Sequence, residues 1–222
     1  MSKNKCRQCG IVNLSEDKTC RRCGASLNDE QSNESSAAEG TIEPRGIGRR
    51  LLWIAGTTTL LLFIAYMSLL LTSADLNYDQ RNTVNAAVVL LEQDGFGKQA
   101  FVLNWLVRYR GTDSWWNRYV GHRDAYAATN FPFEVLTLYP EFFQHSVDDN
   151  ERAAILLHEA YHLLGSGEDV ALEGVWRNKQ RLGWTAEKYG HTKVWINTRD
   201  LTMAHVPNLF SCGPDGKSDC TQ

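Results

Sequence analysis

Residues 158–168 read HEAYHLLGSGE, and their types and spacing suit metal chemistry. His158 and His162 are four positions apart, so an α-helix would carry both imidazoles on one face, one turn apart, with Glu159 beside them. Two imidazoles at this spacing can bind one zinc ion, and the neighbouring glutamate can reach a water molecule at that ion. The alternative is an ordinary amphipathic helix, and a third ligand distinguishes the two.

Three acidic residues downstream can supply that ligand: Glu168, Asp169 and Glu173. In a continuous helix, Glu173 would lie more than about 20 Å along the axis from His158, too far to share one ion. We therefore expect the chain to reverse at Gly165 and Gly167, because glycine tolerates the left-handed conformation that ends a helix.

A second helix is predicted to begin near residue 168. In that helix Glu168 falls in line with the inward-facing Leu172 and Val175, whereas Asp169 and Glu173 pair with each other on another side. Glu168 is therefore the favoured third ligand, and Glu173, Asp169 or a distant histidine are the alternatives.

With this turn, the segment resembles the zincin metallopeptidases. The metzincin pattern H-E-x-x-H-x-x-G-x-x-H is matched by His158, Glu159, His162 and Gly165, and Glu168 stands at the third-ligand position, where metzincins carry His or Asp. A glutamate ligand is typical of gluzincins, which carry it on a later helix, and aspzincins place an acid soon after a glycine. The resemblance covers residues 148–175. It implies an α+β zincin-like domain with an active-site helix and an edge strand, and a zinc-bound water activated by Glu159.

The elements that must position these residues are visible in the sequence. Asp148 and Glu151 fit a capping box at the start of the active-site helix, and residues 82–93 have helical character. Residues 133–139 alternate as a strand does, and Pro140 ends the pattern, which favours a strand near a sheet edge. The zincin resemblance implies that this strand borders the cleft and pairs with an extended peptide.

Other residues of this region have less specific signals. The candidates for stabilising an oxyanion are Tyr126, Tyr189, His191 and His205. Taken singly, His122, His145, His191 and His205 are expected to be ordinary hydrogen-bonded residues. Met203 is expected to be a buried core methionine rather than a metzincin-type methionine turn. The following aromatic residues are expected to pack in a core or interface: Trp105, Tyr109, Trp115, Trp116, Tyr119 and Tyr126.

The N-terminal cysteines form a second metal-binding pattern. Cys6, Cys9, Cys20 and Cys23 make two C-x-x-C pairs, each followed by a glycine, which suits a tetrahedral thiolate site. The pattern resembles the short zinc ribbons at the cytoplasmic ends of bacterial membrane proteins. About 24 residues cannot fold on hydrophobic burial alone, so a structural zinc ion is expected to stabilise them. The basic residues here are expected to be a solvated surface.

The chain separates into segments of different composition. Residues 1–24 are the predicted ribbon, residues 25–50 a polar disordered linker, residues 51–74 an uncharged transmembrane helix, and residues 75–222 an extracytoplasmic domain. Arg45, Arg49 and Arg50 precede the apolar segment and Asp75 and Asp79 follow it, which predicts a cytoplasmic N-terminus in the cytoplasmic membrane. Cys212 and Cys220 on the exterior side can form a disulfide.

The sequence thus predicts a membrane-anchored zinc metallopeptidase with one catalytic and one structural zinc ion, acting on a peptide or protein substrate. Hydrolysis of a non-protein amide, such as cell-wall material, stays within the same class. The alternative is a non-catalytic zinc-binding sensor or scaffold, which a sealed site or a fourth protein ligand would favour. The net charge of −3 gives no reason to expect nucleic acid as a partner.

Overall fold

The computed structural model describes residues 3–27, 47–120, 125–130, 132–213 and 218–221, and the chain divides into two compact units, Met1–Leu52 and Trp53–Gln222. It is an α+β structure with small sheets. Most of the expected linker, residues 28–46, lies outside the described residues.

The first unit contains a small antiparallel hairpin formed by β1 (Lys3–Lys5) and β2 (Val12–Leu14). Beyond the hairpin, Thr19 pairs with Ser26, and the Leu27 N–H donates to the carbonyl of Lys18 at 2.9 Å. The described fold therefore continues three residues past the expected boundary at residue 24. So small a fold buries little apolar surface, and its four cysteines are free thiols that could stabilise it by binding a metal ion.

Helix α1 (Ile47–Leu71) is long and apolar enough to cross a membrane. Its 25 residues extend over about 37 Å at a rise of about 1.5 Å per residue. Large apolar side chains from Leu51 to Ile64 are exposed, whereas Leu69 near the end of the helix is buried. The helix stops at Leu71, three residues before the expected end of the apolar segment.

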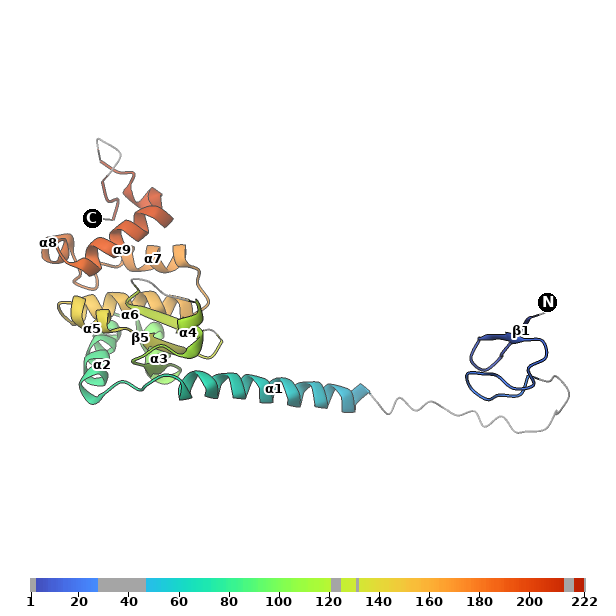
Figure 1. Cartoon of the computed structure of the whole chain (residues 1–222). Helices are drawn as coiled ribbons and strands as arrows, with labels where there is room; N and C mark the ends of the chain where they lie inside the picture. Colours follow the sequence, from blue (N-terminus) through green and yellow to red (C-terminus); the bar gives the residue numbers. More distant parts are fainter. Residues whose placement is uncertain (1–2, 28–46, 121–124, 131, 214–217, 222) are drawn as a thin grey trace. The chain divides into compact units, whose positions relative to one another are not determined.

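The second unit begins at Trp53 within α1, and a mixed set of helices and strands follows that helix (Figure 1). Its strands are β3 (Arg108–Arg110), β4 (Ala127–Asn130) and β5 (Val135–Leu138). Its helices are α2 (Tyr78–Gln93), α3 (Gly97–Trp105), α4 (Trp115–Val120), α5 (Pro140–His145), α6 (Asp149–Leu163), α7 (Glu168–Arg177), α8 (Ala186–Tyr189) and α9 (Lys193–His205), followed by the 3-10 helix η1 (Pro207–Phe210).

The expected position of the strand at 133–139 near a sheet edge is wrong. β5 lies between β3, which is parallel to it, and β4, which is antiparallel, and all four of its residues are buried. Pro140 follows the strand because it begins α5, where its missing N–H costs nothing, and not because β5 is an edge strand. Among the described strands of this sheet, β4 is the outer one on the side of α6 (Asp149–Leu163).

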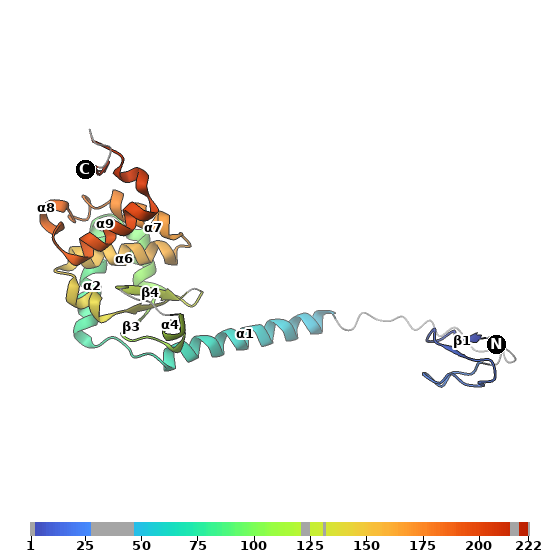
Figure 2. The same ribbon diagram turned by 45° about the horizontal axis from the view of Figure 1, so that its top comes forward.

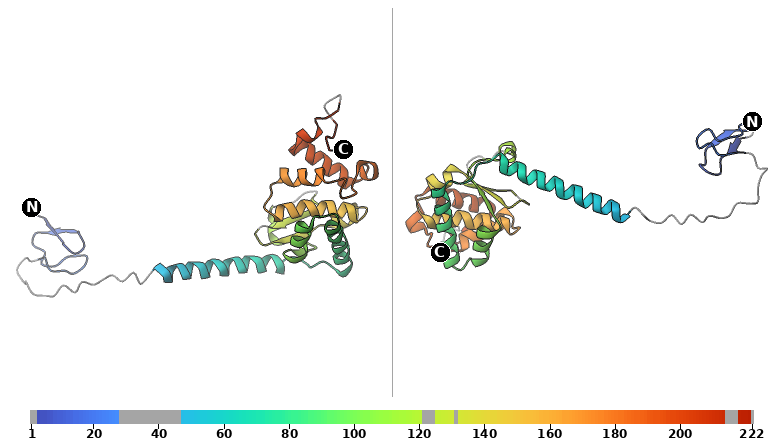
Figure 3. Two further views of the ribbon diagram at one scale, coloured as in Figure 1. Left: turned by 180° about the vertical axis from the view of Figure 1, so that it is seen from behind. Right: turned by 90° about the horizontal axis from the view of Figure 1, so that it is seen from below.

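Helix α6 lies in the middle of the second unit. The sheet lies on one side of it and α7 and α9 on the other, while α2 and α3 also pack against it (Figures 1 and 2; Figure 3, left, gives the view from behind). The rings of Trp176 on α7, Trp184 in the following segment and Trp195 on α9 contact one another and are almost fully buried. This packing fixes α6 on several sides, so side chains on α6 are held by the core of the unit.

One sequence-based expectation about packing is wrong: Met203 is 42% exposed on α9 and is not a core methionine. Of the aromatic residues expected to pack in a core or an interface, Tyr109 is partly buried. Trp105, Trp115, Trp116 and Tyr119 are exposed and are not part of the core. A helix of six residues such as α4 (Trp115–Val120) is too short for its sequence periodicity to indicate which of its sides packs against the rest of the fold.

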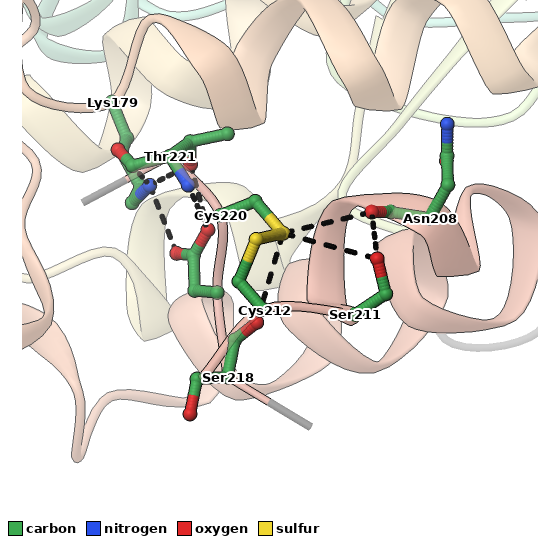
Figure 4. Close-up of a disulfide and its surroundings, with 8 residues drawn as sticks. Lys179, Asn208, Ser211, Cys212, Ser218, Cys220 and Thr221 are labelled. Carbon is green, nitrogen blue, oxygen red and sulfur yellow. Dashed lines mark hydrogen bonds and ion pairs between the residues drawn. A yellow bond between two sulfur atoms is a disulfide. The ribbon is translucent and has the colours of Figure 1, made fainter. Parts of the chain in front are cut away.

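The C-terminal segment is tied to the rest of the second unit (Figure 4). Cys212 and Cys220 form a disulfide, as the sequence suggested, and the Cys220 N–H donates to the carbonyl of Leu209 at 2.8 Å. Next to the disulfide, the almost fully buried Lys179 ammonium lies 2.9 Å from the Asp219 carboxylate and donates to the Thr221 carbonyl at 3.0 Å.

Candidate metal centres

Helix α6 begins at a cap that differs from the predicted capping box. The Asp148 carboxylate accepts hydrogen bonds from the N–H groups of Asn150 and Glu151, as expected of an N-cap. The Glu151 side chain, however, accepts from the N–H of Val147 at 3.0 Å instead of that of Asp148. Glu151 is fully buried and also accepts from Thr192, so it connects the start of α6 to the start of α9.

The reversal after α6 occurs where the sequence predicts it. Gly165 has a φ of +85°, and its N–H donates to the carbonyl of His162 at 2.9 Å. The Ser166 N–H donates to the carbonyl of Tyr161, which satisfies another carbonyl of the last turn. Gly167 is extended and precedes α7 as its N-cap, so the left-handed position is Gly165. Glu168 is then the first residue of α7.

This turn brings three side chains together. The Nε2 atoms of His158 and His162 are 3.0 Å apart, and the Glu168 carboxylate lies 3.5 Å from the former and 3.1 Å from the latter. The ligand atoms of all three residues lie within 4.8 Å of one another, so the group could hold a metal ion. In a tetrahedral site with bonds of about 2.0–2.1 Å, ligand atoms are about 3.3–3.4 Å apart, and the observed separations fit that spacing.

The protonation states of this group follow from its contacts. Burial lowers the pKa of His158. The hydrogen bond between the His162 imidazole and the Glu168 carboxylate raises the pKa of His162 and lowers the pKa of Glu168. The Nδ1 atom of His162 lies 3.0 Å from the carbonyl of Ser166, so Nδ1 carries a proton and Nε2 of the neutral ring keeps a lone pair for a metal.

The alternative third ligands point elsewhere. Glu173 pairs with Arg177 at 2.6 Å, and Asp169 pairs with His205 at 2.9 Å. Both acids face away because α7 rotates successive side chains by about 100°, and each finds a basic partner on that side. Of the three acids, the one next to the histidines is Glu168.

Glu159 lies in the same region but makes a different contact. Its carboxylate accepts a hydrogen bond of 2.6 Å from the Thr129 hydroxyl on β4, and its side chain is buried. Sequence reasoning missed Thr129, because the run AYAATN has no apolar alternation long enough to identify a strand. In β4, Ala127 and Thr129 are half-buried, and both line the cleft that contains Glu159.

An open cleft of about 1330 Å³ contains the three-ligand group. One side is formed by residues 125–129 of the β4 region, the floor by α6, and other parts by α5, α7 and α9. The cleft therefore borders β4 and not β5, which corrects the strand expected from the zincin resemblance. β5 cannot reach it, because β4 covers that side of β5.

The four oxyanion candidates are separated by the fold. Tyr126 lines the cleft, where its hydroxyl accepts from Asn197 at 3.0 Å and its ring contacts His145; burial raises the pKa of its phenol. Tyr189 donates to Asp148 at the start of α6, and His205 pairs with Asp169. His191 is exposed and outside the cleft lining. His122 lies outside the described residues.

The second candidate centre is the cysteine group of the first unit. The Sγ atoms of Cys6 and Cys23 are 3.7 Å apart, and those of Cys9 and Cys20 are 3.5 Å apart. All four sulfur atoms lie within 4.8 Å of one another, so this group also could hold a metal ion. Zinc–sulfur bonds of about 2.3 Å give sulfur separations of about 3.8 Å in a tetrahedron, close to those observed.

The two cysteine pairs have the same backbone structure. The N–H of Gly10 donates to the carbonyl of Cys6, the N–H of Gly24 donates to the carbonyl of Cys20, and both glycines have a φ near +70°. A glycine suits both positions, because glycine adopts this left-handed conformation without steric cost. Backbone N–H groups of Cys23 and Arg22 lower the pKa of the Cys20 thiol to about 6, which favours the thiolate that a metal binds.

Comparison of the chain with protein-family models, with curated proteins and with solved structures found no match. The assignment of function consequently rests on the residues and geometry of the two candidate centres.

Proposed function

We propose that this protein is a membrane-anchored, zinc-dependent peptidase whose catalytic site is formed by His158, Glu159, His162 and Glu168. The observation that carries this proposal is the convergence of three metal-ligating side chains beside a fourth, differently held carboxylate in an open cleft. Three protein ligands leave a coordination position open, which is typical of catalytic sites and not of structural ones.

The roles of the side chains follow from their contacts. His158, His162 and Glu168 would hold the zinc ion, which when bound polarises a water molecule and the scissile carbonyl. Glu159 is outside the ligand group and would accept the proton of the attacking water and pass it to the leaving amine. Thr129 holds the carboxylate of Glu159 on the β4 side of the cleft. The Tyr126 hydroxyl, which lines the same cleft, is a candidate donor to a developing oxyanion.

The shape of the cleft supports an extended substrate. Its volume of about 1330 Å³ exceeds the range of about 300–1,000 Å³ that is usual for small-molecule pockets. One side is the outer strand β4, and an edge strand can pair with an extended peptide through main-chain hydrogen bonds. A peptide or a peptide-like amide is therefore the substrate class that we propose.

The membrane placement in this proposal rests on α1 and on the cysteines. Arg49 and Arg50 lie at the start of α1 and Asp75 follows its end, a distribution that favours a cytoplasmic N-terminus. The unit with the cleft contains a disulfide, whereas the four described cysteines of the other unit are free thiols. Disulfides persist in oxidising compartments and zinc thiolate sites in reducing ones, so the cysteines before α1 and the disulfide after it suit opposite sides of the cytoplasmic membrane.

The cysteine group would bind a second, structural zinc ion. With four sulfur ligands no coordination position is left for a substrate, and the metal would stabilise the small fold of the first unit. We propose no catalytic role for this group.

The proposal is tested by measuring hydrolysis of a mixture of unstructured peptides by the purified full-length protein. Replacing Glu159→Gln removes the proton acceptor but no proposed ligand, so we expect hydrolysis to be lost while zinc is retained. Glu173→Gln is the matched control, because Glu173 pairs with Arg177 on the outside of α7. Equal hydrolysis by the Glu159→Gln protein would remove Glu159 from the mechanism. Zinc binding without hydrolysis of peptides or cell-wall amides would favour the sensor or scaffold.

A further inference from the structure

An exposed row of aromatic rings lies on the short helix α4. Trp115 is 46% exposed, Trp116 45% and Tyr119 80%, and Val120 beside them is also exposed. The rings contact one another in sequence, with centroids 5.6 Å apart for the two tryptophans and 6.0 Å apart for Trp116 and Tyr119. A contiguous apolar surface of this kind on a folded protein marks a contact with another phase or another molecule.

The inner side of α4 is fixed to the domain. Asn117 is almost fully buried, and its side-chain amide donates to the Thr137 hydroxyl on β5 at 3.0 Å. Ser114, directly before the helix, is fully buried as well. Because the polar side of α4 faces the sheet, the aromatic side is held outward by the fold.

Helix α4 lies next to the last turns of α1 (Figure 2) and is hydrogen-bonded to them. The Trp115 indole N–H donates to the Ser68 hydroxyl at 3.0 Å, and the Trp115 backbone N–H donates to the Thr72 hydroxyl at 3.1 Å. The Arg118 guanidinium donates to the carbonyl of Thr72 at 3.0 Å. These hydrogen bonds place the aromatic row beside residues 68–72 of α1.

The end of α1 is joined rigidly to the sheet as well. The buried Arg110 on β3 donates to the carbonyls of Leu70 and Ser73 and pairs with Asp75. These contacts satisfy carbonyls at the C-terminal end of α1 and place a positive charge at the negative end of its dipole. The sheet is thus held on the end of α1 without a free linker.

The position of the row along α1 can be compared with the thickness of a bilayer. Ser68 is 18 residues beyond Arg50, the last cation before the apolar stretch, and at about 1.5 Å per residue this is about 27 Å along the helix axis. Thr72 is about 33 Å from Arg50 by the same arithmetic. The two residues lie on either side of the far boundary of a hydrocarbon core of about 30 Å.

We propose that the α4 face formed by Trp115, Trp116, Tyr119 and Val120 sits in the phospholipid headgroup region of the bilayer that α1 crosses. This inference rests on the membrane span in the proposed function, and it is independent of the peptidase activity. Trp and Tyr concentrate at this depth because their rings combine an apolar body with a polar group. The exposed Arg118 on the same helix adds a positive charge suited to lipid phosphates. The seated face fixes the domain, and with it the cleft, against the membrane surface.

Site-specific photocrosslinking of the full-length protein in vesicles of phosphatidylethanolamine and phosphatidylglycerol tests this seating. A photoreactive benzophenone residue replaces Tyr119 in one protein, Phe63 in a second and Met203 in a third, one residue at a time. All three native side chains are exposed, so the replacements do not enter the core. Phe63 lies within α1 and reports the span, and Met203 lies on α9, beyond α6 and α7 from the sheet. Lipid adducts on each peptide are measured by mass spectrometry.

We expect lipid adducts at positions 63 and 119 and none above background at position 203. Adducts at position 63 without adducts at 119 would overturn the seating of α4 and leave the membrane span intact. Adducts to a protein instead of a lipid at position 119 would overturn it in favour of a protein partner. Equal lipid adducts at 119 and 203 would also overturn it, because the contact would not be specific to α4. No adduct at position 63 would remove the membrane span and this inference together, without touching the zinc site.

Discussion

At the scale of single residues, the site depends on two carboxylates with different surroundings. Glu168 lies against the two imidazoles, and the hydrogen bond from His162 keeps its pKa low, so it is available as an anionic ligand. Glu159, from the same cleft, is held by a neutral hydroxyl from β4. In the proposed mechanism, this difference separates a metal ligand from a proton acceptor within one cleft.

Replacing Thr129→Val should lower kcat of peptide hydrolysis with little change in KM. Valine keeps the shape of the side chain but removes the donor to Glu159, and hydrogen bonds to charged groups contribute about 1.5–3 kcal/mol, or about 10- to 100-fold in rate. Thr129→Ser keeps the hydroxyl and should retain most of the activity. Steady-state kinetics of the three proteins measure this, and equal kcat values for valine and serine would show that the hydroxyl does not position Glu159.

At the scale of elements, the site depends on how closely α7 approaches α6. Gly174 on α7 faces the ring of Tyr161 on α6, and a Cβ at Gly174 would lie 2.5 Å from that ring. The close packing sets the position of α7, whose first residue is Glu168. A glycine in the middle of a helix is otherwise unfavourable, so this contact explains its presence.

Gly174→Ala should therefore destabilise the protein and weaken zinc binding at the His158–His162–Glu168 site. Overpacking of this kind costs about 1–3 kcal/mol, and moving α7 away from α6 carries the Glu168 carboxylate from the histidines. Gly97→Ala is the control, because a Cβ at that position in α3 meets no atom within 4 Å and alanine favours a helix. Chemical denaturation and zinc titration of both variants measure the effect; matching stabilities would contradict the close-packing argument.

The sequence predicts elements well where a local rule decides them. Periodicity and glycine placement predicted α6, the turn at Gly165 and the start of α7, and spacing predicted the convergence of the cysteines. The order of the strands depends on long-range pairing, so β5 was misplaced at an edge and β4 was missed. The partners of Asp169 and Glu173 come from α9 and from the next turn of α7, and spacing alone could not distinguish these pairs.

At the scale of the whole molecule, the C-terminal segment is held by a buried ion pair and a disulfide. Burial alone would raise the pKa of Asp219, but hydrogen bonds from Lys179 and Thr221 hold that pKa below its usual value. Lys179 is 1% exposed, so its ammonium depends on these partners. The arrangement joins the last residues to the segment that follows α7, beside the disulfide in Figure 4.

Through Asp219, this pair should make the stability of the protein fall in acid. Because the folded pKa of Asp219 lies below the unfolded value of about 3.9, its stabilisation is present above that pH and is lost as the pH falls through the folded pKa. Asp219→Asn leaves a buried ammonium without its counter-charge and should cost about 3 kcal/mol at pH 7. Thermal unfolding at neutral and acid pH measures both effects, and a variant as stable as the wild type at pH 7 would contradict the role of the pair.

The central claim is that the three-residue group in the cleft binds zinc. The direct test is the zinc content of the purified full-length protein, measured beside Glu168→Ala and Glu173→Ala under non-chelating conditions. We predict about two zinc ions per wild-type chain, about one after Glu168→Ala and about two after Glu173→Ala. About one zinc ion in the wild type, unchanged by Glu168→Ala, would mean that only the cysteine group binds metal, and it would contradict the proposed peptidase site.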